Sequence, residues 1–99
     1  MIVYNVTVKI DTEVHKDWLQ WITNVHIPDV MATGCFTEYR LLQVLNEEKD
    51  GFTYSVQYHC ENMANLYWYQ KNHAPALQQE HEERYKDKFT AFRTVLKEL

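Results

Sequence analysis

The chain has 99 residues, of which 45% are hydrophobic and 14% aromatic, and its formal net charge is −4. A chain of this length buries roughly two-thirds of its unfolded surface on folding, so we expect one folded domain over residues 1–99. The ten Lys and Arg residues are scattered through an acidic chain, which argues against binding to nucleic acids or membrane surfaces, because both need a clustered basic face.

Four strands and two helices are predicted in chain order from the two apolar periodicities, alternate residues for strands and every three to four for helices. Pro28 should end the first helix because it lacks an N–H, and Gly34 should supply a left-handed exit. The polar stretch before Gly51 is typical of a hairpin turn. The expected elements are a strand over 2–10, a helix capped by Asp11 or Thr12 and ending near 26–27, a helical turn over 29–32, strands over 36–45 and 52–60, a helix from Asn62 to about Tyr85, and a strand over 88–96.

A short internal repeat indicates how these elements are arranged. Trp21, His26 and Pro28 recur with the same spacing as Trp68, His73 and Pro75. The order is therefore βαβ twice. Two such halves make the ferredoxin-like α+β fold, a four-stranded antiparallel sheet whose first and third strands are central and whose helices cover one face.

The helix-free face of this sheet should be covered by a second copy of the chain. It carries polar and apolar side chains together, and this mixture suits a half-closed cavity between two packed sheets. We therefore expect a homodimer. The residues expected on this face are Val3, Asn5, Thr7, Ser55, Gln57 and His59 from the central strands and, if Tyr39, Leu41 and Leu45 face the helices, Phe36, Glu38, Arg40, Leu42 and Val44 from the second strand.

The chain resembles the dimeric α/β-barrel superfamily, which includes antibiotic-biosynthesis monooxygenase-like and ethyl tert-butyl ether degradation-like proteins. It is most similar to a bacterial domain-of-unknown-function family of about 100 residues. The resemblance implies a ferredoxin-like monomer and a dimeric barrel, with no established activity. The segments that carry it are residues 2–8, 26–34, 40–42, 54–58, 73–77 and 92–94.

The same superfamily contains haem-degrading monooxygenases, which use an Asn on the first strand with a Trp and a His on the second helix. Asn5 and Trp68, with His73 or His81, are residues of these types. Their spacing departs from the family's pattern, and Pro75 interrupts the segment. We therefore expect poor haem binding and no cofactor.

The candidate ligand-binding residues follow from strand alternation. A guanidinium among apolar neighbours, such as that of Arg40, needs a carboxylate or an anionic ligand, and Glu38 on the same strand face is the alternative partner. The two repeated His residues precede X-Pro breaks, where they could line a cavity mouth or merely satisfy helix-end carbonyls and pack on Trp. The predicted site residues are Asn5, Arg40, Gln57 and His59, with His26 and His73 at the rim.

Other reactive residues are predicted to be structural. The run from Glu80 to Arg84 lacks the second His of a zinc-protease helix and is interpreted as a solvated face with Glu80 and Arg84 paired. No metal site is expected. Cys35 and Cys60 lack metal-ligand spacing and are interpreted as reduced, buried thiols; a disulfide between them is the alternative.

Two functions of different classes remain open. The first is binding of a small organic molecule inside the dimeric barrel, with monooxygenase-like or cofactor-independent chemistry; whether the protein is an enzyme stays undecided. The alternative is a non-catalytic dimeric structural or interaction module. The N-terminus has no signal-peptide character and no apolar run is long enough to span a bilayer, so the expected location is the cytoplasm.

Overall fold

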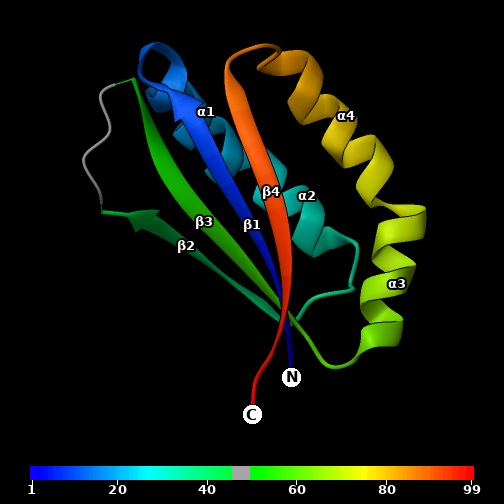
Figure 1. Cartoon of the computed structure of the whole chain (residues 1–99). Coiled ribbons are helices and arrows are strands. Elements are labelled where there is room, and N and C mark those ends of the chain that lie inside the picture. Colours follow the sequence, from blue (N-terminus) through cyan, green and yellow to red (C-terminus); the bar gives the residue numbers. More distant parts are fainter. Residues whose placement is uncertain (46–49) are drawn as a thin grey trace.

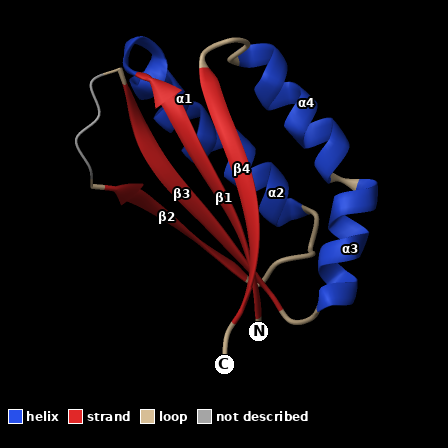
Figure 2. Ribbon diagram, viewed as in Figure 1, coloured by secondary structure: helices blue, strands red, loops and turns tan. Residues whose placement is uncertain are grey.

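The computed structural model describes residues 1–45 and 50–99. Its four strands, β1 (Ile2–Asp11), β2 (Glu38–Val44), β3 (Gly51–Cys60) and β4 (Phe89–Lys97), form one antiparallel sheet in the order β2-β3-β1-β4 (Figure 2). The central strands are β3 and β1, and the helices lie on one side of the sheet (Figure 1). The predicted ferredoxin-like α+β fold is confirmed.

The first helical region is longer than predicted because Pro28 does not end it. A 3-10 turn (Thr12–Val14) leads into α1 (His15–Trp21), a π-helical turn (Ile22–His26) and α2 (Ile27–Ala32), with Pro28 in the first turn of α2. The wide π turn accommodates a residue without an N–H, so the helix continues past it. Asp11 precedes the 3-10 turn, but no side chain caps it, so the predicted cap is wrong.

The second helical region is interrupted where one helix was predicted. Asn62 caps α3 (Met63–Asn72) by accepting a hydrogen bond from the backbone N–H of Asn65 at 2.9 Å, as predicted. His73 then leaves helical geometry, with φ −123°, and α4 (Ala74–Arg84) starts with Pro75 in its first turn. The two Pro residues of the repeat therefore have different effects, one within a continuous helix and one after a break.

The core lies between the sheet and the helices. Alternate residues of β1 and β3 point into it, including Tyr4, Val8 and Tyr58. The helices contribute residues at helical spacing, such as Trp18 from α1 and Leu66 from α3, both fully buried. Apolar periodicity therefore predicted the core-facing sides of β1 and β3, together with the buried positions Trp18 and Leu66 on the helices.

Strand β2 is shorter than predicted, and two residues that were expected at its ends lie outside it. Phe36 was expected on the helix-free face, but it precedes the strand and is only 6% exposed in the core. Its ring stacks on Tyr4 with centroids 6.2 Å apart. Leu45, expected to face the helices, follows the strand and is 89% exposed. Strand alternation does not extend to residues outside the strand, which explains both errors.

Both described glycines occupy positions where a residue with a Cβ would be strained or too close to its neighbours. Gly34 has φ +76° and forms the predicted left-handed exit. A Cβ at Gly51 would lie 2.8 Å from the carbonyl oxygen of Ile10, so only glycine lets β3 approach β1 this closely. The preceding segment 46–49, part of the predicted turn, is outside the described residues.

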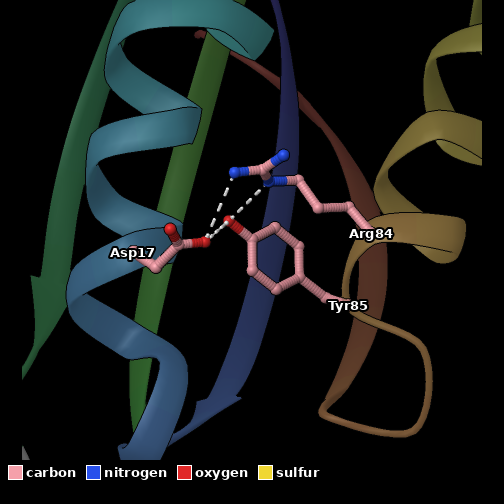
Figure 3. Close-up of polar contacts among 3 residues, drawn as sticks. All are labelled: Asp17, Arg84 and Tyr85. Carbon is pink, nitrogen blue, oxygen red and sulfur yellow. Dashed lines mark hydrogen bonds and ion pairs between the residues drawn. The ribbon is translucent and has the colours of Figure 1, made fainter.

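Arg84 pairs with a different partner from the one predicted. Its guanidinium nitrogen lies 3.6 Å from Oδ2 of Asp17, and the Tyr85 hydroxyl donates to the same oxygen at 2.7 Å. Nε of Arg84 donates to the Tyr85 hydroxyl oxygen at 3.2 Å, so the three side chains form a clasp between α1 and the end of α4 (Figure 3). The predicted pair with Glu80 is wrong because Arg84 extends toward α1.

Within the described residues, both cysteines are free and buried, and no group of three His, Cys, Asp or Glu side chains could hold a metal. No described helix has the length and apolar character needed to cross a membrane.

Candidate functional site

A cavity lies between the helices and the β1–β4 side of the sheet. Its volume is about 40 Å³, which is room for a few water molecules or one end of a ligand. Most of its walls are apolar, and the polar side chains among them come from several elements of the fold. The lining residues are Tyr4, Val6, Val8, Ile22, His26, Val30, Val56, Tyr58, Tyr69, Leu77, Gln78, His81, Phe89, Ala91 and Arg93.

A wider groove adjoins the cavity between α4 and β4, which run alongside each other in Figure 1. The groove has a volume of about 680 Å³. It shares part of its lining with the cavity, including Gln78, His81 and Arg93. A ligand could therefore lie in the groove and insert one end into the cavity.

His81 stands at the junction of the cavity and the groove. It is only 8% exposed, and its Nε2 accepts a hydrogen bond from Trp18 Nε1 at 2.8 Å. Because Nε2 accepts, the proton of the neutral ring is on Nδ1. Burial, reinforced by His26 and Arg93, lowers the pKa of His81 to about 4. The ring is therefore neutral at pH 7 and has one N–H to donate.

His26 ends the π-helical turn and faces the same cavity. Its ring stacks on Trp21 with centroids 5.1 Å apart and lies 5.9 Å from that of His81. Burial lowers the pKa of His26 to about 4, although Asp29 opposes the shift. Two neutral imidazoles thus share one wall, and each can donate or accept a hydrogen bond.

Arg93 brings a positive charge to the cavity. Arg93 is a residue of β4 and lies opposite Val6 of β1, on the face of the sheet that packs against the helices. Burial raises the pKa of Tyr4, and the guanidinium of Arg93 opposes that shift through its charge and a hydrogen bond. Among the described residues, no carboxylate forms an ion pair with Arg93. The cavity therefore combines a cation, phenols and neutral imidazoles on apolar walls.

Four of the predicted site residues gather on the helix-free face. Arg40 pairs with Gln57 in the sheet register, and Gln57 pairs with Asn5, so the three form one row. His59 lies in the next row, with Nδ1 3.5 Å from Oε1 of Glu38. Arg40 lies on the helix-free face, as predicted. Its role in ligand binding stays a prediction.

Neither His26 nor His73 reaches that row. His26 lies on the opposite side of the sheet, in the cavity. His73 is half-buried between α3 and α4 and packs near Tyr69, with ring centroids 6.3 Å apart. The packing alternative for His26 is the one observed, on Trp21. The six predicted residues therefore lie in three separate places: four on the helix-free face, His26 in the cavity, and His73 between α3 and α4.

The sequence interpretation missed His81 and Arg93 as cavity residues. His81 was assigned to a solvated face because of its acidic neighbours, although it falls four residues after Leu77 on the buried stripe of α4. Arg93 shares a strand face with Phe89 and Ala91. Helical spacing and strand alternation were the available signals.

Haem does not fit this arrangement. Asn5 lies on the helix-free face, whereas His81 lies in the cavity on the other side of the sheet. Trp68 is 62% exposed on α3. Nε2 of His81 already accepts the Trp18 hydrogen bond. The three residue types of the haem-degrading enzymes are therefore present but do not form one site.

Comparison with known proteins identifies a family and a fold. A family model described as a domain of unknown function, DUF4286, matches residues 1–99. No match was found among curated protein sequences.

Solved structures with this fold have little sequence identity to the chain. An ethyl tert-butyl ether degradation family protein from Bacillus halodurans is 11% identical with a TM-score of 0.69, covering 100% of both chains. The heme-degrader MhuD from Mycobacterium tuberculosis is 15% identical with a TM-score of 0.72, covering 100% of this chain and 96% of its own. A dimeric ferredoxin-like protein from an uncultured marine organism is 12% identical with a TM-score of 0.72, covering 100% and 98%. The comparisons thus confirm a domain-of-unknown-function family of about 100 residues and the ferredoxin-like fold that the resemblance implied.

Proposed function

We propose that this chain, which belongs to the DUF4286 family of domains of unknown function, binds a small organic molecule in the cavity and groove between α4 and β4. The observation that carries the proposal is the convergence of Arg93, His26 and His81 on a largely apolar pocket. Binding sites for small molecules have this composition, in which apolar walls supply affinity and a few polar groups fix orientation.

The proposed site is on the helix side of the sheet, whereas the sequence analysis expected the ligand inside the barrel. The helix side is favoured because a cavity lies there with two neutral imidazoles, the half-buried His26 and the buried His81, beside the charged Arg93. On the helix-free face, Asn5 already accepts from the Ser55 hydroxyl and donates to Thr7 at 3.0 Å. Of the similar structures, that of MhuD holds two hemes in its active site, which supports small-molecule binding as a use of this fold.

A thermal-shift screen of organic metabolites tests the proposal, and variants locate the site. Ala91→Trp places a bulky side chain where the cavity and groove meet, so it should abolish the shifts. Ala64→Trp, on the exposed face of α3, is the matched control and should retain them. Hits that survive Ala91→Trp but are lost in Arg40→Ala would move the site to the helix-free face and refute the proposal.

We also propose that two copies associate through the helix-free face. Phe92 on this face is 63% exposed, and Val3, Leu42 and Leu96 lie on the same side by register. Apolar side chains grouped on one face favour burial against a partner. The dimeric ferredoxin-like protein with the same fold supports this arrangement.

A further inference from the structure

We infer that the ligand of the cavity is an organic anion, a carboxylate or enolate on an apolar body, and that Arg93 binds its charge. The inference rests on the proposed function, because it names the chemical class that the same pocket would take. It depends on three features: the charge of the lining, the hydrogen-bond donors that converge there, and the position of the apolar walls.

The first feature is an uncompensated positive charge. Among the described residues that line the cavity, Arg93 is the one that is charged at pH 7. Three other described cations have carboxylate partners: Lys9 with Asp50 at 3.1 Å, Arg84 with Asp17 at 3.6 Å, and Lys88 with Glu13. A guanidinium left unpaired beside apolar walls attracts an anion, and it can bind a carboxylate through two parallel hydrogen bonds.

The second feature is that hydrogen-bond donors face the same space. The bond from Trp18 fixes the proton of His81 on Nδ1, and this N–H has no partner within the part of the chain that the structure describes. The side chains of Gln78 and Tyr4 also line the cavity and can donate. A ligand that presents acceptor oxygens satisfies these donors together with Arg93.

The third feature determines the ligand's orientation. Arg93 lines both the small cavity and the groove, so it stands at the junction between them. Phe89 and Ala91 form apolar walls beside it. Glu82 lines the groove but not the cavity, and its carboxylate would repel an anion placed further out. The charged end of the ligand therefore lies at the junction, with its apolar body along the groove.

The experiment compares two probes of the same shape, 2-naphthoate and its neutral amide 2-naphthamide, by titration of ¹⁵N-labelled protein in solution NMR. Arg93→Gln removes the charge, and Arg93→Lys retains it. Arg40→Gln is the matched control, because it removes an Arg from the other face of the sheet. Amide signals of each variant report its folding before any probe is added.

We expect 2-naphthoate to shift the amide signals of Ala91 and Arg93 and to bind at least about tenfold more tightly than 2-naphthamide. Arg93→Gln should remove this preference, whereas Arg93→Lys should keep part of it and Arg40→Gln all of it. Equal binding of both probes in the cavity, unchanged by Arg93→Gln, would overturn the inference and leave the cavity function standing. No shift at the cavity residues would overturn both.

Discussion

The imidazole of His81 connects two helices that are far apart in the sequence. Trp18 of α1 donates to Nε2 of His81 on α4, and the bond is buried. The bond needs an unprotonated Nε2, and burial keeps the ring neutral by lowering its pKa to about 4. Protonation would place a positive charge near Arg93 and remove the acceptor for Trp18.

His81 should therefore make the fold sensitive to mild acid. The pKa of an unfolded His is 6.5, above the folded value of about 4, so the unfolded chain takes up the proton first as the pH falls. The stability contributed by neutral His81 is present above pH 6.5 and is lost between pH 6.5 and 4, by roughly 3 kcal/mol at most. The free energy of unfolding, measured by urea denaturation at several pH values, checks this.

His81→Gln isolates the effect, because a Gln oxygen can accept the Trp18 bond without titrating. We expect the variant to lose less stability than the wild type between pH 6.5 and 4, whatever its stability at pH 7. His26 also has a pKa lowered to about 4 by burial, so the variant should retain part of the pH dependence. Parallel pH curves for the two proteins would contradict the assignment.

At the scale of the elements, the clasp of Asp17, Arg84 and Tyr85 closes one end of the helix layer (Figure 3). Tyr85 is buried, and its hydroxyl is the central member, donating to Asp17 and accepting from Arg84. The ion pair between Arg84 and Asp17 is largely exposed and contributes little by itself. Removing the hydroxyl of Tyr85 should therefore lower the free energy of unfolding.

Tyr85→Phe should lower the free energy of unfolding by about 0.5–1.5 kcal/mol, the usual contribution of an intramolecular hydrogen bond. Tyr39→Phe is the matched control, because Tyr39 is exposed on the edge strand β2, and it should change stability by less than about 0.5 kcal/mol. Equal effects of the two substitutions would mean that the clasp does not stabilise the fold. Thermal or urea unfolding of both variants decides between these outcomes.

The repeated Pro residues show how local context changes the effect of one residue. Pro28 follows a π-helical turn and lies in the first turn of α2, so the chain continues in the same direction. Pro75 follows His73, which has left helical geometry, and α4 starts as a separate helix. The break lets α4 stand beside β4 (Figure 1), and the groove forms between them.

For the whole molecule, the helix-free face determines the expected assembly. Its four columns of side chains place polar residues such as Asn5 and Gln57 near the centre, with Leu42 and Phe92 to either side by register. Packing two such faces would bury the apolar side chains and leave the polar row in the interior of the barrel, where water can bridge it.

Light scattering at micromolar concentration should therefore give twice the chain mass. The double variant Leu42→Glu with Phe92→Glu should give the mass of a monomer, because buried carboxylates from two copies would repel each other. Tyr67→Glu, on the exposed side of α3, is the control and should remain dimeric. A wild-type monomer, or a double variant that stays dimeric, would exclude this interface.

Local patterns in the sequence determined the strands, and the internal repeat indicated their order in the sheet, while the orientation of the second strand stayed conditional on its register. Alternation decides which side chains share a face of a strand, and it placed Asn5, Arg40, Gln57 and His59 together. It does not apply outside a strand, so Phe36 and Leu45 were misplaced. Tertiary structure alone decided the pocket, because His26, His81 and Arg93 come from three distant segments. Their proximity depends on the angle at which α4 packs beside β4 after the break at His73, and no local sequence pattern encodes that angle.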